Sequence, residues 1–200
     1  MYNWATQGLN YYLCEKLHWN PELDVDDLID DYCTSGFGDA APDVKAYFLR
    51  REELTNLVAA DEAVRITHPY TPEILRELRA HLLRAAGNVD AVPEHAARVK
   101  FLQAGLDYTE AYVAGFRLFR AHEAAGGGRL SKELKQEIRV VVDENWLKYR
   151  EMFEHHHMAV NVATVAWGSR AYFGRYYWSS PSPEVLENVL GPGKELSARY

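Results

Sequence analysis

Three consecutive histidines, His155 to His157, follow Glu151 in a segment with helical periodicity and form the best candidate for metal chemistry. Glu151 and His155 are four residues apart and would share one helical face. Successive helical residues point about 100° apart, however, so the three histidines cannot converge on one ion. Glu154 and His157 form one Glu-x-x-His pair, but a diiron bundle needs such pairs on two facing helices. We predict no cofactor and no metal site, with Glu151 and His155 as the weak candidate ligands, and interpret the histidines as solvated groups near a helix end.

The acidic residues are concentrated in one stretch, with eight carboxylates and no Lys or Arg from Glu22 to Asp43. The stretch lacks the Asx spacing and the glycine of a calcium-binding loop, so a helix cap followed by a solvated face is the better interpretation. A net charge of −7 argues against nucleic acid as a partner. Short nucleotide-binding, zinc-protease and serine-hydrolase motifs are missing from the sequence.

Two groups of aromatic residues are candidates for sugar binding, since sugar rings stack on aromatic side chains. One comprises Trp4, Tyr11, Tyr12 and Trp19; the other comprises Tyr172, Phe173, Tyr176, Tyr177 and Trp178. At helical spacing, both groups are more typical of a core than of a ligand platform. The two cysteines, Cys14 and Cys33, lack metal-type pairing, and we predict reduced, packed thiols, with a disulfide as the alternative.

The elements that would position these residues are helices. Apolar residues recur with helical spacing, and proline, glycine and capping residues separate the segments. We predict helices over 5–18, from Asp24 to near Gly36, over 41–63, from Thr71 to Gly87, along a wide apolar segment from about Val99 to the glycines at 126–128, and from Ser131 onwards. On the predicted 41–63 helix the buried side carries Val44, Phe48, Leu54 and Val58, and on the wide segment one stripe carries Val99, Leu102, Leu106, Val113 and Phe116.

Convincing strand alternation is missing, so the predicted fold class is all-α: a single domain of long antiparallel helices over residues 1–180, followed by a surface or frayed tail over 181–200. Neither a signal peptide nor a membrane-spanning apolar run is evident, and the sequence leaves the localisation unknown.

Three stretches carry a resemblance to a known family. "WATQGLNYYLCEKLHWNP" (4–21) followed by "DVDDLIDDYCTSGFGDAAPDVKAYF" (24–48) resembles the C-terminal helical part of the bacterial family called domain of unknown function 4838, whose members are similar to glycoside hydrolases. The same order of features also looks like the region after the catalytic barrel in family 67 α-glucuronidases. "VKFLQAGLDYTEAYVAGFRLFRAHE" (99–123) is similar to the long central helix of that region.

The resemblance implies that the catalytic carboxylates belong to a (β/α)₈ barrel upstream of this chain. The first helix would correspond to the last barrel helix, with residues 1–20 containing that helix and its exit joint at His18, Trp19 and Pro21. Four residues at its start would then lie nearest a bound sugar: Asn3, Trp4, Thr6 and Gln7. Ordinary packing at a helix start is the alternative for Trp4 and Gln7.

The expected function is that of a non-catalytic C-terminal helical domain in a carbohydrate-active protein, serving as scaffold, oligomer surface or cleft wall. Without its barrel, such a domain would expose apolar residues of the first helix and would self-associate through them: Leu9, Tyr12, Leu13 and Leu17. Met1 is consistent with a truncated reading frame or with a natural stand-alone protein. Two alternatives stay open: a stand-alone helical protein that binds a ligand or metal through His155–His157, and a glycan-binding module that uses Trp178.

Overall fold

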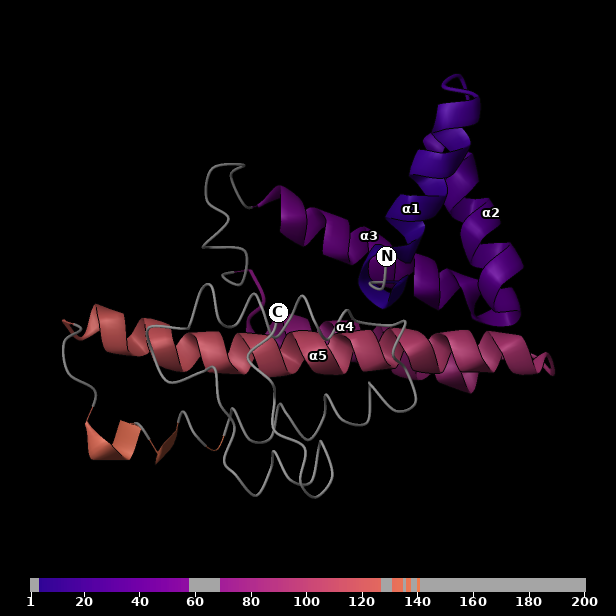
Figure 1. Cartoon of the computed structure of the whole chain (residues 1–200). Coiled ribbons are helices and arrows are strands. Elements are labelled where there is room, and N and C mark those ends of the chain that lie inside the picture. Colours follow the sequence, from indigo (N-terminus) through magenta and orange to yellow (C-terminus); the bar gives the residue numbers. More distant parts are fainter. Residues whose placement is uncertain (1–3, 58–68, 127–130, 135, 138–139, 141–200) are drawn as a thin grey trace, which may run out of the picture. The chain divides into compact units, whose positions relative to one another are not determined.

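The structure is a computed structural model that describes residues 4–57, 69–126, 131–134, 136–137 and 140. Every regular element within these ranges is a helix, which confirms the all-α prediction (Figure 1). The chain divides into two compact units, residues 1–106 and 107–200, and each is treated by itself. The division into a domain over 1–180 and a tail over 181–200 stays a prediction, because most of residues 127–200 lie outside the described ranges.

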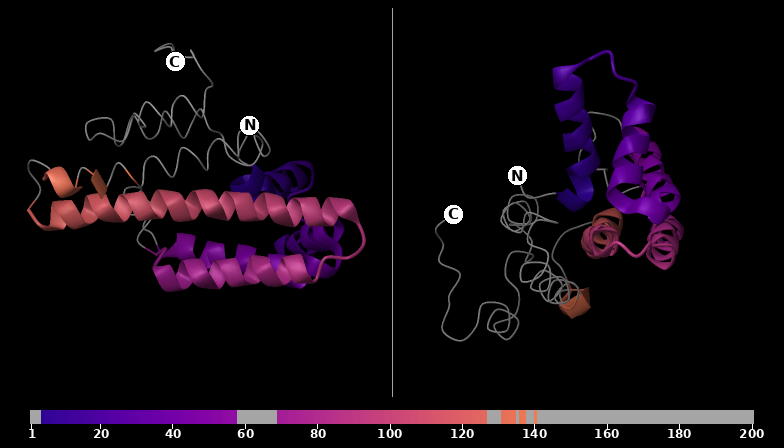
Figure 2. Two further views of the ribbon diagram at one scale, coloured as in Figure 1. Left: turned by 90° about the horizontal axis from the view of Figure 1, so that it is seen from below. Right: turned by 90° about the vertical axis from the view of Figure 1, so that its right-hand side faces the viewer.

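The first unit begins with a helical hairpin. α1 (Trp4–Trp19) and α2 (Val25–Phe37) lie side by side in Figures 1 and 2, joined by residues 20–24. Asp24 caps α2 by accepting hydrogen bonds from the backbone N–H groups of Asp26 at 2.9 Å and Asp27 at 3.1 Å. Cap and first-turn acids are therefore placed as the sequence predicts.

Three further helices complete this unit. The short 3₁₀ turn η1 (Gly38–Ala40) leads into α3 (Ala41–Asn56), which packs against α2 and α4 (Pro72–Gly87). Thr71 caps α4 through a hydrogen bond from Ile74 N, and Pro72 occupies its first position, as predicted. α5 (Pro93–Ala124) follows, and only its portion up to Leu106 belongs to the first unit.

One prediction about helix length is wrong. α3 ends at Asn56, before the predicted Ala63, and Leu57 forms a turn in which its side chain is 72% exposed. The Thr55 hydroxyl donates a hydrogen bond to the carbonyl of Arg51 at 3.0 Å. A bond from a Thr hydroxyl to the carbonyl four residues back competes with the backbone ladder and slightly weakens a helix.

The core of the first unit is formed by all five helices. Its buried members include Ile29, Cys33, Phe37, Val44, Tyr47, Phe48, Leu54, Leu78, Leu82, Val99, Leu102 and Leu106. Val44, Phe48 and Leu54 confirm the buried side predicted for α3, whereas Val58 lies outside the described residues. Burying a large apolar side chain of this kind stabilises a fold by about 1.5–3 kcal/mol.

Small residues bring α1 against α5. Ala5 is fully buried, and a Cβ added to Gly105 would lie 2.7 Å from the Ala5 Cβ. This distance is shorter than two carbon atoms tolerate, so Gly105 allows the two helix backbones to approach closely. Leu9 and Leu13 extend the contact by packing against the core.

In the second unit, the described part of α5 has Val113 buried and ends before Gly126, whose φ of 102° suits glycine. Ser131 then caps a helical turn by accepting a hydrogen bond from Leu134 N at 3.1 Å, as predicted. The side chain of Phe116 and most of the predicted sixth helix fall outside what the structure describes.

Candidate binding pocket between α1, α2 and α5

An open pocket of about 500 Å³ lies within the first unit, where α1 and α2 meet the start of α5. Its lining comes from α1 (Tyr12, Lys16), from α2 (Asp31, Tyr32, Ser35, Gly36, Phe37) and from α5 (Arg98, Phe101, Leu102). The volume is in the range of small-molecule sites. The lining combines four aromatic rings, two of them from tyrosines, with one carboxylate, one serine hydroxyl and two cations.

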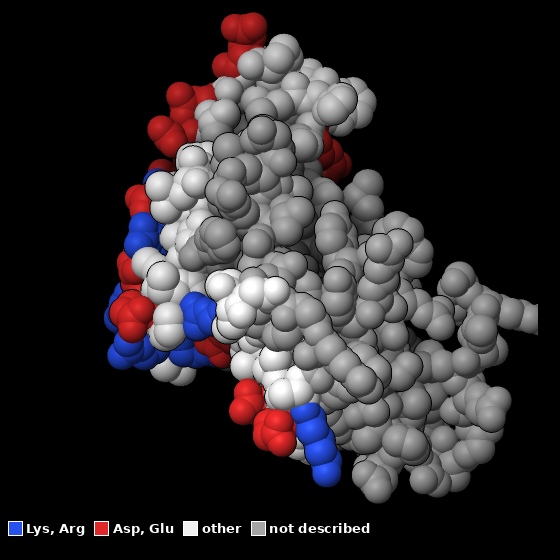
Figure 3. Space-filling view, turned by 90° about the vertical axis from the view of Figure 1, so that its left-hand side faces the viewer, with Lys and Arg blue, Asp and Glu red and all other residues white. Residues whose placement is uncertain are grey.

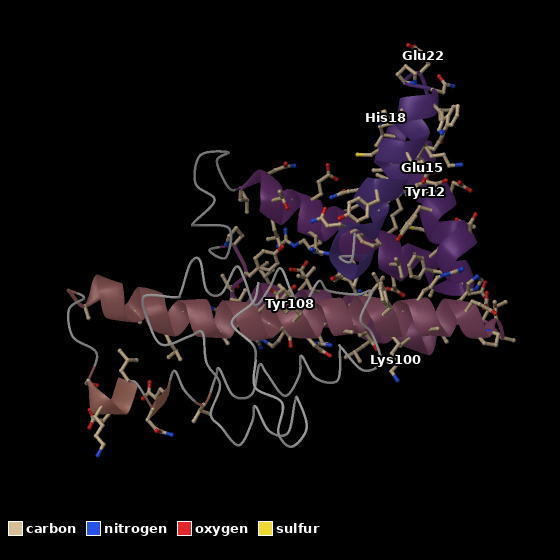
Figure 4. The ribbon with its side chains drawn as sticks, in the orientation of Figure 1. Tyr12, Glu15, His18, Glu22, Lys100 and Tyr108 are labelled. Carbon is tan, nitrogen blue, oxygen red and sulfur yellow. The ribbon has the colours of Figure 1, made fainter. Side chains whose placement is uncertain are left out.

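The Tyr12 and Asp31 pair forms the polar centre of the pocket. Tyr12 lies on the side of α1 that faces α2 (Figure 4), and its hydroxyl donates a hydrogen bond to Asp31 Oδ2. The Ser35 hydroxyl, one turn along α2, donates to Asp31 Oδ1 at 3.0 Å. These two bonds stabilise the ionised carboxylate, and Tyr12, followed by Ser35, lowers the pKa of Asp31. The same bond raises the pKa of Tyr12 to about 12.

Aromatic rings form the apolar wall. Tyr32 makes tilted contacts with Tyr12 at a centroid distance of 5.3 Å and with Phe37 at 5.9 Å. Tyr32 also packs edge-on against Phe48, so the core holds its ring in place. Burial raises the pKa of Tyr32 to about 12.

Two cations approach the pocket from different helices. The Lys16 ammonium group lies 5.2 Å from the centroid of the Tyr12 ring, within the range of a cation–π interaction. The Arg98 Nη1 donates a hydrogen bond to the carbonyl of Gly36 at 2.9 Å, near the end of α2. Both side chains are exposed, so a ligand in the pocket can contact their charged groups.

Directly after α2, the backbone at Gly38 lies very close to the side chains of Asp90 and His95. Its φ of 54° lies in the left-handed region, and a Cβ there would lie 2.0 Å from Asp90 Oδ2 and 2.5 Å from His95 Nδ1. Asp90 and His95 are paired at 2.9 Å, and the Asp90 carboxylate also accepts a hydrogen bond from Val92 N. The end of α2 thereby lies close to the start of α5, and Arg98 and Phe101 of α5 line the same pocket as Asp31.

The predicted sugar-adjacent residues are only partly described. Gln7 is half-buried, and its side-chain oxygen accepts a hydrogen bond from Asn10 Nδ2 at 2.8 Å within α1. Trp4 and Thr6 belong to the first turn of α1, but their side chains, like the whole of Asn3, fall outside the described residues. The role assigned to these four residues stays a prediction.

The exit joint of α1 forms the end of the hairpin. Trp19 is 87% exposed there, and His18 Nδ1 bonds to the Cys14 carbonyl at 2.9 Å. The Asn20 side chain accepts a hydrogen bond from Glu22 N at 3.1 Å, which shapes the turn before α2. Figure 3 shows acidic side chains gathered over this end, while basic and acidic side chains mix further along the same face.

Both cysteines are free, so the disulfide alternative is excluded. Cys33 is packed as predicted, and burial raises its pKa to about 11. Cys14 is exposed, so the prediction of a second packed thiol is wrong. Cys14 follows the core-facing Leu13 and is therefore turned about 100° away from the contact with the core.

The predicted metal candidates Glu151 and His155 lie outside the described part of the chain, as does Trp178. Within the described residues, no group of three or more His, Cys, Asp or Glu side chains is arranged to hold a metal ion. No helix in those same ranges is long and apolar enough to cross a membrane.

Sequence reasoning identified Tyr12 as an aromatic candidate, but not Phe101 or the pocket that the two residues line. A signal was present, since Tyr12 and Lys16, and likewise Asp31 and Ser35, are four residues apart and so share a helical face. Which faces meet in space depends on the packing of three helices, and helical spacing alone does not specify it.

Comparison with known proteins supports one part of the resemblance. A family described as Domain of unknown function (DUF4838) matches residues 1–49, which contain α1, α2, η1 and the first part of α3. Residues 99–123 lie outside that match. No curated protein and no solved structure is significantly similar to the chain.

Proposed function

We propose that this chain is a non-catalytic helical domain of a carbohydrate-active protein and that its pocket between α1, α2 and α5 binds a saccharide. The observation that carries the proposal is the pairing of exposed hydrogen-bonding groups with a fixed aromatic wall. Sugars present apolar C–H faces to aromatic rings and hydroxyls to carboxylate and hydroxyl groups. Tyr12, Asp31 and Ser35 offer the second kind of contact beside the rings of Tyr32 and Phe101.

The match to a family of unknown function over residues 1–49 is consistent with this proposal, because that range contributes seven of the lining residues: Tyr12, Lys16, Asp31, Tyr32, Ser35, Gly36 and Phe37. A glycoside-hydrolase-like parent with an upstream catalytic barrel is part of the same proposal. In that arrangement the helical domain would contribute a wall of the substrate cleft or a site that retains the glycan.

We also propose the upstream barrel, or a second copy of the chain, as the partner of α1. Leu9, Tyr12, Leu13 and Leu17 are all half-buried, so some of their apolar surface is available for contact. Size-exclusion chromatography with light scattering tests self-association of the whole chain. A dimer that Leu17→Ser converts to a monomer supports contact through α1, whereas a dimer unaffected by that substitution argues against it.

Saccharide binding is tested by screening the whole chain on a glycan array and measuring the best ligand by calorimetry. Replacing Phe101 by Ala is expected to weaken binding about fivefold or more, since stacking of a ring on an aromatic side chain contributes on the order of 1–3 kcal/mol. Trp19→Ala is the matched control, because Trp19 is an exposed aromatic residue outside the pocket.

Two results would contradict the proposal. One is the absence of any glycan ligand. The other is binding that Trp19→Ala abolishes and Phe101→Ala leaves intact. Circular dichroism of each variant verifies that the helices are retained.

A further inference from the structure

The charges around the pocket differ from those of the surrounding surface. The chain has a net charge of −7, and the stretch from Glu22 to Asp43, which includes all of α2, has eight carboxylates and no Lys or Arg. Both cations of the pocket therefore come from other helices, Lys16 from α1 and Arg98 from α5. Asp31 is the single carboxylate among the lining residues, so the lining has one excess positive charge.

The negative charge of the pocket is already matched by protein groups. Asp31 accepts hydrogen bonds from Tyr12 and from Ser35, one on each carboxylate oxygen. Lys16 adds a favourable electrostatic interaction with the same carboxylate. Asp31 therefore has its stabilising partners before any ligand arrives, and the other cation of the lining, Arg98, is not needed to neutralise it.

The guanidinium group of Arg98 has spare hydrogen-bonding capacity. It has five N–H donors, and within the described residues the hydrogen bond of Nη1 to the Gly36 carbonyl fixes one end of the group. That bond orients the planar group at the pocket without neutralising its charge. A guanidinium presented in this way is suited to a carboxylate or sulfate oxygen pair.

We propose that the pocket selects a saccharide that has one anionic group, bound by Arg98 with support from Lys16, while the sugar ring contacts the aromatic wall. This inference rests on the proposed function, because it names the class of saccharide that the same pocket takes. The acidic residues along α2 disfavour the same anion on the surface beside the pocket. A carboxylate and a sulfate ester have the same charge and similar oxygen geometry, and the experiment distinguishes between them.

The test measures binding of D-glucose, D-glucuronate and glucose 6-sulfate to the whole chain by ligand-observed NMR at low and high salt. Both anionic probes, or one of them, are expected to bind at least about tenfold more tightly than glucose, because hydrogen bonds to charged groups are stronger than neutral ones. Higher salt is expected to reduce the anionic affinity and to leave glucose binding unchanged.

Matched variants assign the effect to the pocket. Arg98→Gln is expected to remove most of the preference for the anionic probe over glucose, and Lys16→Gln is expected to have a smaller effect. Lys100→Gln is the control, because Lys100 is an exposed cation of the same helix that does not line the pocket (Figure 4). The Lys100→Gln variant should show the same preference for the anionic probe over glucose as the wild-type chain.

The outcomes separate this inference from the proposed function. Equal affinity for glucose and the anionic probes overturns the anionic preference and leaves saccharide binding standing. A preference that Lys100→Gln reduces as much as Arg98→Gln also overturns it, because the effect would then be a general one of net charge. Failure of all three probes, together with a blank glycan array, overturns both. A preference for glucuronate alone identifies a carboxylate ligand, and a preference for glucose 6-sulfate alone identifies a sulfate ester.

Discussion

At the scale of single residues, the hydrogen bond between Tyr12 and Asp31 links α1 to α2 across the pocket. It lowers the pKa of Asp31 from its ordinary value of 3.8 and raises the pKa of Tyr12 from 10.0 to about 12. The contribution of Asp31 to stability is therefore present above pH 3.8 and is lost as the pH falls through its lower folded-state pKa. That of Tyr12 is present below pH 10.0 and is lost as the pH rises toward about 12.

Replacing Tyr12 by Phe is expected to raise the pKa of Asp31 toward 3.8, because the largest cause of its lowering is removed. Ser35→Ala removes the second hydrogen bond and is expected to raise the pKa of Asp31 by less than Tyr12→Phe does. An NMR titration of the carboxyl carbon measures both shifts. An Asp31 pKa that is the same in Tyr12→Phe and in the wild-type chain would show that the bond does not form in solution.

Gly38 and Gly36 form a matched pair for stability. Gly38→Ala is expected to lower the free energy of unfolding by more than about 2 kcal/mol, because φ is positive and the added Cβ would overlap Asp90 and His95. A Cβ added at Gly36 would have no atom within 4 Å, so Gly36→Ala is expected to raise the free energy of unfolding by roughly 0.5–1 kcal/mol, since alanine favours the helix. Urea unfolding of both variants measures the difference, and equal effects would contradict the close approach at Gly38.

At the scale of elements, the crossing of α1 and α5 depends on the absence of a side chain at Gly105. Helix propensity alone predicts that Gly105→Ala stabilises α5 by about 1 kcal/mol. The structure predicts the opposite sign, a loss of about 1–3 kcal/mol, because the new Cβ would lie 2.7 Å from the Cβ of Ala5. Thermal and urea unfolding determine the sign, and a stabilised variant would mean that α1 does not pack on α5 in this way.

The elements were predictable from sequence to different degrees, depending on how local their causes are. The caps Asp24 and Thr71 were predicted because each is set by bonds to residues two or three positions away. The end of α3 was not, because the apolar pattern continues past Asn56 and gives no stop signal. The exposure of Cys14 and the pocket itself depend on which helix faces meet, and contacts between distant residues such as Arg98 and Gly36 determine that.

At the scale of the whole molecule, the account makes a single claim: an acidic helical chain concentrates two cations and an aromatic wall at one pocket, and a saccharide binds there. This claim concerns the first unit alone, because every residue that lines the pocket lies within residues 1–106. The exposed hairpin end with Trp19 is the competing aromatic surface, and it is distant in sequence from Arg98 and Phe101.

The most direct test is a map of backbone amide chemical shifts of the whole chain as the best glycan ligand is added. The account predicts saturable shifts in three segments, 12–16, 31–37 and 98–102, which together line the pocket, and no shift at residues 18–25 around Trp19. Saturable shifts centred on Trp19, or on residues outside these three segments, would contradict it.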